Sequence, residues 1–246
     1  MTTRYKTQAF VFKKNNINES DRIFSVFTDG FGRLDIFAKA IRKNASKLRS
    51  GIDIFFVSEI EFIQGKNRKT LTDAHAIENF NNLARNLEKF RIAGRIGEIL
   101  DNFIKGEEKD EKIFNLLNET FSKLNNFQFQ ILNSQLLYYY FLWNILSLLG
   151  YHSEVQRCAS CHDKLIPYNI HFSSKEGGII CKKCLNKDKF AKKINSDIVK
   201  ILRIILSKDW QTLSKLKIEL SSQKLLENIS DNYYSYILSG NSFKNN

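Results

Sequence analysis

The feature that most restricts the fold of this chain is a pair of Cys-x-x-Cys motifs. The first reads Cys158-Ala-Ser-Cys161, nineteen residues follow, and the second reads Cys181-Lys-Lys-Cys184. Two thiolates from each motif can share one tetrahedral ion, and four cysteines leave no open coordination position. The spacing therefore predicts a closed, structural zinc site with the ligands Cys158, Cys161, Cys181 and Cys184.

Other interpretations of these cysteines are a pair of disulfides or four unrelated buried thiols. We expect a cytoplasmic protein, because nothing at the N-terminus resembles a targeting segment, and disulfides rarely persist in the cytosol. His162 and His171 could each replace a cysteine as a ligand, but four cysteines suffice, so we expect both to be exposed loop histidines. Gly177-Gly178 predicts a tight turn that aims the second motif at the first, as in a zinc ribbon.

The charge of the chain indicates a polyanionic partner. Lys and Arg outnumber Asp and Glu by 38 to 26, which gives a net charge of +12 and a pI near 9.5. Nucleic acid and anionic lipid both fit this excess. The most apolar run, from Leu136 to Tyr151, is shorter than the roughly 20 residues that a membrane crossing needs, so we expect a buried core helix there and no membrane partner.

The first 80 residues have the alternating pattern of strands, rich in β-branched and aromatic residues and separated by turns with Asn, Asp and Gly. Five short strands over this length predict a small closed barrel, for which the five-stranded OB-fold fits best. Many OB-folds bind oligonucleotides across one face. The expected strands are Lys6–Lys13, Arg22–Thr28, Arg33–Lys39, Ile54–Ile63 and Thr70–Ile77.

Beyond Phe80 the apolar residues follow helical spacing. A first helix is expected to place on one face Leu83, Leu87, Phe90 and Gly94, continued by Ile99, Leu100 and Phe103. Further helices are predicted around Ile113–Leu124, over Ile131–Leu149, from an N-cap at Ser196, over Trp210–Leu220 and over Leu225–Leu238. The fold class is thus α+β and multidomain. The expected parts are an OB-fold at 1–80, a helical domain at 81–150 and 194–240, an inserted zinc module at 151–193 and a frayed tail at 241–246.

A basic loop follows the third predicted strand. No acidic residue occurs between Ile36 and Ile52, whereas five basic residues lie within eleven positions. A long loop of this kind on a small barrel suits a phosphate backbone, although a solvated basic loop is the plainer interpretation. The candidate nucleic-acid contacts are Lys39, Arg42, Lys43, Lys47 and Arg49. Most aromatic residues of the barrel belong to its core by alternation, but Phe31, between two turn glycines, is a candidate exposed base-stacking platform.

Two further basic sets are less specific. Arg85, Lys89, Arg91 and Arg95 border the apolar stripe of the first helix and could receive an acidic peptide with a hydrophobic end, or could form a solvated face. A lysine-rich set surrounds and follows the second cysteine motif and could extend a DNA path or keep the module in solution. It comprises Lys182, Lys183, Lys187, Lys189, Lys192 and Lys193.

Catalytic motifs are missing from the sequence. It contains no phosphate-cradling glycine loop, no dinucleotide-binding motif, no His-Glu-x-x-His and no Gly-x-Ser-x-Gly. We therefore expect a protein that is not an enzyme. A zinc-dependent nucleic-acid enzyme is disfavoured by the closed metal site, and a zinc-ribbon regulator without annealing activity stays as the alternative function.

Several short stretches follow one another in a specific order: Glu19-Ser-Asp-Arg-Ile23, Thr28-Asp-Gly-Phe-Gly32, the loop from Ala38 to Arg49, Gly150-Tyr151 ahead of the first cysteine motif, and Gly177-Gly178 ahead of the second. Their order resembles the bacterial RecO family of DNA repair and recombination proteins. Ala40 stands where that family usually has glycine, and Asn44-Ala45 replaces a common proline, which leaves the path of the basic loop open.

The resemblance implies an OB-fold, a helical domain and an embedded zinc module whose metal is structural, since not all members keep the cysteines. It implies a recombination mediator that binds single- and double-stranded DNA, anneals complementary strands and works at the nucleoid. With RecR, such a protein helps to place RecA on DNA coated by single-strand-binding protein (SSB). Family members bind the acidic C-terminal tail of SSB through the helical domain, and the assignment of Arg85 to Arg95 to this contact is our hypothesis from charge.

Overall fold

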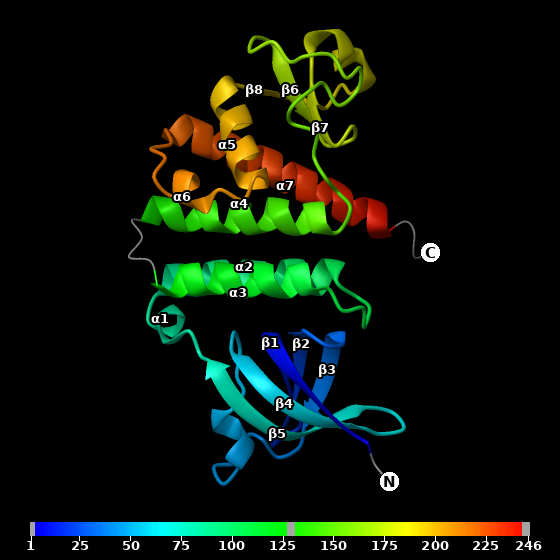
Figure 1. Ribbon diagram of the computed structural model, residues 1–246, viewed down its shortest axis with the longest axis vertical. Helices are drawn as coiled ribbons and strands as arrows, with labels where there is room; N and C mark the ends of the chain where they lie inside the picture. Colours follow the sequence, from blue (N-terminus) through cyan, green and yellow to red (C-terminus); the bar gives the residue numbers. More distant parts are fainter. Residues whose placement is uncertain (1–2, 127–130, 243–246) are drawn as a thin grey trace. The chain divides into compact units, whose positions relative to one another are not determined.

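The computed structural model describes residues 3–126 and 131–242, without the side chains of 131–134 and 241–242. The chain divides into two compact units, residues 1–138 and 139–246 (Figure 1). In the first unit, five strands form a closed barrel in the order β1-β2-β3-β5-β4. Their bounds are β1 Arg4–Ile17, β2 Asp21–Thr28, β3 Gly32–Ala38, β4 Val57–Gln64 and β5 Lys69–Glu78.

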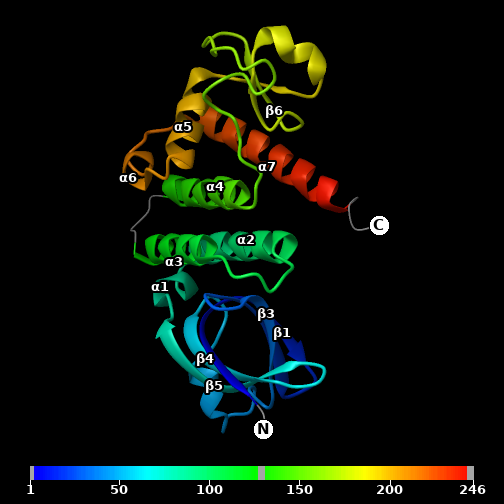
Figure 2. The ribbon, with the colours of Figure 1, turned by 45° about the vertical axis from the view of Figure 1, so that its right-hand side comes forward.

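The barrel closes because β1 is long enough to serve two neighbours. Its N-terminal half pairs with β4 and its C-terminal half with β2, and the pairing register shifts between Val11 and Lys13. A bulge of this kind bends a strand around a barrel corner. The parallel pair of β3 and β5, which joins Ile36 to Lys69, completes the ring that is visible in Figure 2. This strand order confirms the five-stranded OB-fold.

The barrel interior is filled by the alternate residues that the sequence pattern places inward. Ala9, Phe24, Leu34, Ile60 and Phe62 are almost completely buried there. The fourth strand starts later than expected, at Val57, because Phe55 adopts a positive φ of 62° that a strand does not accommodate.

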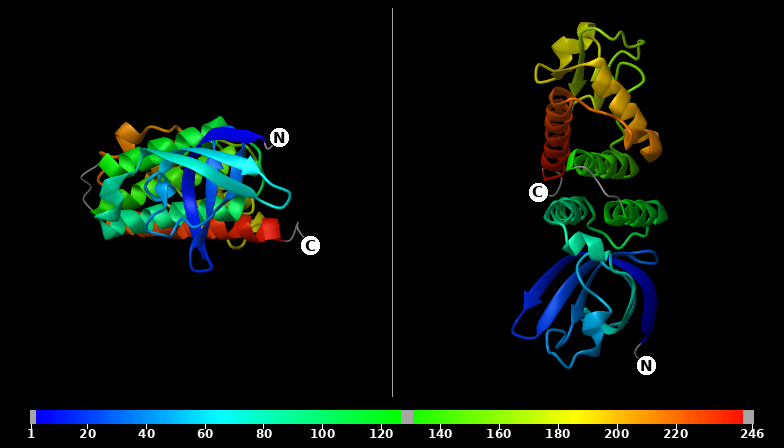
Figure 3. Two further views of the ribbon diagram at one scale, coloured as in Figure 1. Left: turned by 90° about the horizontal axis from the view of Figure 1, so that it is seen from below. Right: turned by 90° about the vertical axis from the view of Figure 1, so that its left-hand side faces the viewer.

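Helices α1 (Asn81–Ala84), α2 (Leu87–Phe103) and α3 (Glu111–Asn126) follow the barrel, and α2 and α3 lie side by side at one of its ends (Figure 3). Phe121 of α3 packs on Phe10 of β1, with ring centroids 4.4 Å apart. Close packing of α2 depends on Gly97, because a Cβ atom at that position would lie 2.8 Å from the carbonyl oxygen of Phe12.

The buried face of α2 differs from the predicted one. Leu87 is 78% exposed and Phe90 is 42% exposed, whereas Ile92, Ala93 and Ile96 are buried. The expected stripe continued from Leu83, but Leu83 belongs to α1, and the chain turns at Asn86 before α2 begins. The helical phase is therefore reset there. The predicted stripe was wrong at Leu87 and Phe90, whereas its continuation at Ile99 and Leu100 is buried. The stripe predicted for α3 is confirmed, with Leu117 and Phe121 completely buried.

Helix α4 (Ile131–Leu148) is the predicted apolar core helix and ends before Gly150, which has a φ of 91°. Its second half belongs to the second unit, where Asn144 donates a hydrogen bond to the carbonyl of Ile205 at 3.0 Å. The indole of Trp143 donates to Ser230 at 3.0 Å. Within the described residues, no helix is long and apolar enough to cross a membrane.

The remaining helices of the second unit are α5 (Ser196–Leu206), α6 (Trp210–Leu213) and α7 (Leu220–Ser242). The N-cap of α5 is Asn195, whose side chain accepts from the backbone N–H of Ile198, so the expectation of a cap at Ser196 was wrong by one residue. The predicted helix over Trp210–Leu220 is limited to α6. Helix α7 continues past Gly240, and the rest of the predicted tail, 243–246, lies outside the described residues.

Between α4 and α5 lies a small three-stranded sheet in the order β7-β6-β8. Its bounds are β6 Ile170–Ser173, β7 Gly178–Ile180 and β8 Lys192–Ile194, and the 3-10 helix η2 (Lys182–Lys187) connects β7 to β8. Phe172 of this sheet contacts the rings of Trp143 and Tyr233, with centroids 5.4 Å away in both cases. These contacts attach the cysteine module to helices from both sides of it in the sequence.

Candidate nucleic-acid interface and metal centre

The four cysteines come together at one point of the second unit. Cys158 and Cys161 lie in the loop before β6, Cys181 follows β7, and Cys184 lies in η2. The tight turn at Gly177 (φ 67°) joins β6 to β7 as predicted and so returns the chain to the first motif. All four Sγ atoms lie within 4.8 Å of one another, which fits a single tetrahedral ion.

The electrostatics of the cluster also fit a cation. Burial of the Cys158 thiol acts to raise its pKa, but backbone N–H groups, among them those of Cys161 and Cys181, lower that pKa to about 6. At Cys161 the backbone N–H of Asp163 acts to lower the pKa, but hydrogen bonds with the other thiols, first of all Cys158, raise it to about 12. Thiolates at this spacing repel one another, so complete ionisation needs a positive charge among them.

The two histidines between the motifs do not belong to this cluster. His162 is exposed, as expected of a loop histidine. His171 is not a loop residue, because it pairs with Ile180 inside the small sheet and is half-buried. Burial lowers the pKa of His171. The donor set near the metal position therefore consists of four thiols among the described residues.

The predicted basic loop connects β3 to β4 and contains the 3-10 helix η1 (Lys47–Ser50). It is held to the barrel at both ends by Ile41 and Ile52, which are 2% and 1% exposed. The Asp21 carboxylate accepts a hydrogen bond from the backbone N–H of Ala40 at 2.7 Å, and this contact lowers the pKa of Asp21. The loop is thus attached to the barrel through its backbone and its two isoleucines.

All five predicted basic contacts are exposed. Arg42 donates to the carbonyl oxygen of Asn18 at 3.1 Å, and Arg49 donates to the side-chain oxygen of Asn44 at 3.2 Å. Within the described part of the chain, none of the five pairs with a carboxylate. The structure therefore gathers Lys39, Arg42, Lys43, Lys47 and Arg49 on one loop with their positive charges uncompensated by ion pairs.

Phe31 is less accessible than predicted. Its ring packs edge-on against Tyr5 and Phe62, with centroid distances of 5.7 and 5.6 Å, and it is half-buried. The expectation of an exposed platform was wrong, because the turn glycines bring Phe31 back over the open end of the barrel core. The expectation that most barrel phenylalanines are core residues is confirmed.

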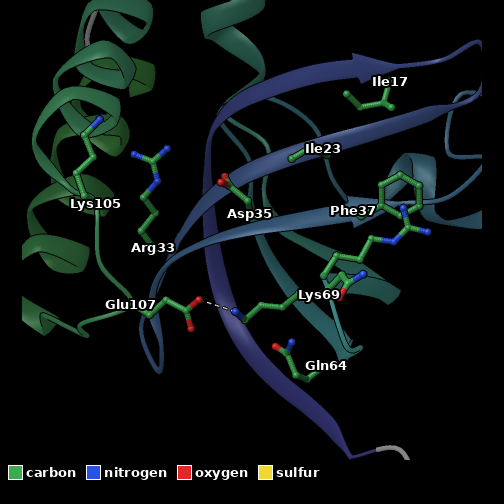
Figure 4. Close-up of a pocket in the computed structure, with 11 residues that line it drawn as sticks. Ile17, Ile23, Arg33, Asp35, Phe37, Gln64, Lys69, Lys105 and Glu107 are labelled. Carbon is green, nitrogen blue, oxygen red and sulfur yellow. Dashed lines mark hydrogen bonds and ion pairs between the residues drawn. The ribbon is translucent and has the colours of Figure 1, made fainter.

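A hollow on the barrel adds basic residues that the sequence analysis did not single out. It has a volume of about 420 Å³, and Arg33, Arg68, Lys69 and Lys105 contribute to its lining. Figure 4 shows Glu107, from the α2–α3 connection, pointing at Lys69, with which it forms an ion pair at 2.5 Å. The sequence contains a signal that could have identified part of this set, because three basic residues lie within four positions, 66–69, at the β4–β5 turn.

Arg68 is the most distinctive member of this set. Its guanidinium lies 3.8 Å from the centre of the Phe37 ring, so the arginine is held flat on the barrel surface while its charge stays exposed. Phe37 itself is only 7% exposed. Arg68 therefore covers an aromatic ring of β3, the strand from which the basic loop starts.

The predicted peptide-binding residues have different surroundings. Arg85 caps the end of α1, Lys89 donates to the carbonyl oxygen of Asn125 at 3.1 Å, and Arg95 stacks on Tyr138 with its guanidinium 3.7 Å from the ring centre. Burial lowers the pKa of Lys89. Arg91 is exposed and lies one helical turn from the exposed Leu87.

These features define the class of protein. A closed OB-fold barrel with a basic loop is followed by a helical region that carries a cluster of four thiols able to hold a metal ion. The family described as "Recombination protein O N terminal" matches residues 1–80, and "Recombination protein O C terminal" matches residues 84–246. The chain therefore belongs to the RecO family.

Curated relatives agree with this assignment. A protein named DNA repair protein RecO from Dehalococcoides mccartyi strain 195 is 34% identical over 214 residues, which cover 87% of this chain and 83% of that protein. The protein of the same name from Caldanaerobacter subterraneus is 29% identical, with 87% and 84% covered. The one from Alkaliphilus metalliredigens is 26% identical over 228 residues, with 93% and 91% covered.

Proposed function

We propose that this protein is a recombination mediator in DNA repair that binds single- and double-stranded DNA through its barrel and anneals complementary strands. With RecR it assists the loading of RecA onto single-stranded DNA coated by SSB. The observation that carries the proposal is a loop on an OB-fold with five exposed basic side chains that form no ion pair within the described residues, in a chain of the RecO family. This role places the protein at the nucleoid.

The chemistry of annealing needs no catalytic residue. Two complementary strands repel each other through their phosphates, and a basic surface lowers that repulsion while the bases stay free to pair. The side chains of Lys39, Arg42, Lys43, Lys47 and Arg49 supply five positive charges in eleven positions. Arg68, just before β5, adds an exposed positive charge on the barrel, whereas the charge of Lys69 is balanced by Glu107.

The metal in this proposal is zinc, held by Cys158, Cys161, Cys181 and Cys184. A four-thiolate site favours zinc among the common divalent ions, and the absence of a fifth donor position makes it a structural ion. When bound, the ion supplies only charge neutralisation and cross-linking. Held by all four cysteines, the ion would connect the loop before β6 to η2 and so hold the small sheet in shape.

The SSB tail is proposed to bind at the start of α2. Leu87 and Phe90 offer exposed apolar surface there, and Arg85 and Arg91 lie beside it, which suits an acidic peptide with a hydrophobic end. We expect Arg85→Glu with Arg91→Glu to weaken binding of an SSB tail peptide. Lys109→Glu, on the α2–α3 connection, serves as the control, and equal binding by all these variants would remove the tail from this surface.

The experiment that tests DNA binding compares two variants of equal charge. Replacing the five basic residues of the loop with alanine should weaken binding of single strand and random duplex. For single strand, it should flatten the slope of log affinity against log salt by up to about 3.5. The control replaces five exposed lysines of the second unit, Lys200, Lys208, Lys215, Lys217 and Lys224. Unchanged affinity of the loop variant at low salt would refute the proposal.

The same DNA-binding assay distinguishes the proposed mediator from the alternative function. A zinc-ribbon regulator without annealing activity would prefer particular duplex sequences over random duplex, whereas a mediator binds both alike. Annealing is followed with complementary labelled oligonucleotides in the absence of nucleotide. Annealing should be slower with the loop variant than with the control variant, because the loop variant neutralises fewer phosphates.

A further inference from the structure

The second unit contains a groove that none of the features above explains. It has a volume of about 330 Å³ and lies between the small sheet and helix α7. Phe172 and Ile229, both buried, form its floor, and Ser174 and Asn232 place polar atoms along it.

Two exposed aromatic rings flank this groove. Phe190, in the turn before β8, is 86% exposed, and Tyr236 of α7 is 50% exposed. Hydrogen bonds fix the turn that carries Phe190. The buried Asp188 accepts hydrogen bonds from the Phe190 backbone N–H at 2.9 Å and from the Ser173 hydroxyl at 2.6 Å. Large aromatic rings left this exposed on a fixed turn and a helix indicate a surface that receives flat or apolar groups.

The surroundings of the groove are basic. Lys175 and Lys192 line it, and four further exposed lysines, Lys182, Lys187, Lys189 and Lys193, lie on the same module. In the described part of the chain these lysines form no ion pair. The one acidic residue of the lining, Asp188, is 7% exposed and already accepts two hydrogen bonds.

Helix α7 turns its acids away from the groove. Ile229, Asn232 and Tyr236 follow each other by three and four positions, and so share one face. Glu227 and Asp231 are each two positions from Ile229, roughly 200° around the helix. The groove therefore combines aromatic rings with positive charge.

We propose that this groove is a second binding site for single-stranded nucleic acid, separate from the barrel. Bases stack on Phe190 and Tyr236, and Lys175 and Lys192 contact the phosphates on either side. Exposed rings favour an unpaired strand over duplex, because bases inside a duplex already stack on each other. Lysines at both sides of the rings favour a polyanion over an uncharged apolar peptide.

A second site deepens the proposed function, because annealing brings two strands together. The biological role of the groove therefore rests on the proposed function. One strand would be held by the barrel loop and the other by the groove. The binding itself is independent of that role. Binding at the groove can therefore be tested even if the barrel does not bind DNA.

The test uses the full chain and an oligothymidylate that contains 5-iododeoxyuridine, which cross-links on irradiation to aromatic side chains that stack on it. We expect cross-linked peptides that contain Phe190 or Tyr236. The variant Phe190→Leu with Tyr236→Leu removes the ring faces and keeps apolar side chains. In the background of the alanine-substituted basic loop, this variant should bind single strand roughly tenfold more weakly or worse.

Tyr168→Leu is the matched control, because Tyr168 is 82% exposed on the same module but does not line the groove. Lys175→Gln with Lys192→Gln should flatten the salt slope for single strand by up to about 1.4. Both groove variants should leave affinity for duplex unchanged.

The results of these experiments distinguish DNA binding at the groove from DNA binding at the barrel. If the loop variant binds DNA as tightly as the unmodified chain, while Phe190 or Tyr236 still cross-links, the barrel proposal fails and the groove stands. If neither residue cross-links and the leucine variant binds single strand like the Tyr168 control, the groove is not a nucleic-acid site. An equal loss for duplex and single strand would overturn the stacking argument.

Discussion

The guanidinium of Arg33, on strand β3, donates to the carboxylate of Asp101, on helix α2, at 2.7 Å. The same guanidinium also donates to the backbone carbonyl oxygens of Asp101 and Ile104, at 3.1 and 2.6 Å. Arg33 thus closes the C-terminal end of α2, where carbonyl groups lack helical partners, and attaches that end to the barrel. Lys13 of β1 donates to the second carboxylate oxygen of Asp101 at 2.7 Å.

Loss of this contact should destabilise the first unit. Arg33→Ala removes the donor of the Ile104 carbonyl and one of the donors of the partly buried Asp101 carboxylate, and we expect it to lower the free energy of unfolding by about 2–3 kcal/mol. Lys6→Ala removes an ion pair with Glu59 that is exposed on both sides, so it should lower the stability much less than Arg33→Ala does. Urea denaturation measures both. Equal midpoints for the two variants would contradict the role of Arg33.

The contribution of Asp101 should depend on pH in a defined direction. Burial acts to raise the pKa of this carboxyl, but the hydrogen bonds from Lys13 and Arg33 lower it below its ordinary value of 3.8. A depressed pKa gives stability that is present above the unfolded-state pKa and is lost as the pH falls through the folded-state pKa. The stability difference between the unmodified chain and Asp101→Asn should therefore be constant above about pH 5 and shrink below about pH 4. A difference that grows on acidification would refute this.

Two glycines of α2 should respond oppositely to alanine. A Cβ atom at Gly97 would meet the Phe12 carbonyl oxygen at 2.8 Å, so Gly97→Ala must displace the helix from the barrel and should cost about 1–3 kcal/mol. At Gly94, a Cβ would have no neighbour within 4 Å in the described structure, and Gly94→Ala should stabilise by up to about 1 kcal/mol. Thermal unfolding of the two single variants provides the comparison. A stabilising Gly97→Ala would show that α2 is not packed this closely.

The Ala40 backbone should gain from glycine. Ala40 has a φ of 53°, a left-handed conformation that costs alanine about 1 kcal/mol, so Ala40→Gly should stabilise the barrel by up to that amount. Ala45→Gly, in the same exposed loop but without a positive φ, should be neutral or slightly destabilising. The two substitutions are compared by their urea midpoints. A less stable Ala40→Gly variant would mean that the loop does not hold this backbone.

Metal content should follow the cysteines and not the histidines. We expect one zinc ion per chain, lost on Cys158→Ser or Cys184→Ser and kept on His162→Ala and His171→Ala. Removal by a chelator should speed hydrogen exchange in β6 and β7, because the ion connects the loops on either side of them, while exchange in the barrel strands stays unchanged. Zinc retained without Cys158 would show that the four thiols are not the ligand set.

Local patterns in the sequence predicted much of the fold. Alternation predicted five strands, and the cysteine spacing predicted the cluster, because both depend on positions close together in the chain. The apolar run around Trp143 likewise predicted a buried helix. In each case the period or the spacing alone determines which side chains can point the same way.

Faces that depend on packing were predicted less well. The stripe through Leu87 and Phe90 was assigned to the core, but the break at Asn86 resets the helix and turns these residues outward. Phe31 was expected to be exposed, but it packs on Tyr5 and Phe62. Neither outcome is encoded in a local period, because it depends on where a distant element lies.

By itself, the sequence determined the strand and helix periods, the excess of positive charge and the presence of four thiols at metal-binding spacing. The tertiary structure decided that β3 pairs with β5 to close the barrel, that Arg33 meets Asp101, and that Phe190 and Tyr236 flank one groove. The physical reason is that these residues are far apart in the chain. They meet only when burial of the two cores has fixed the elements that carry them.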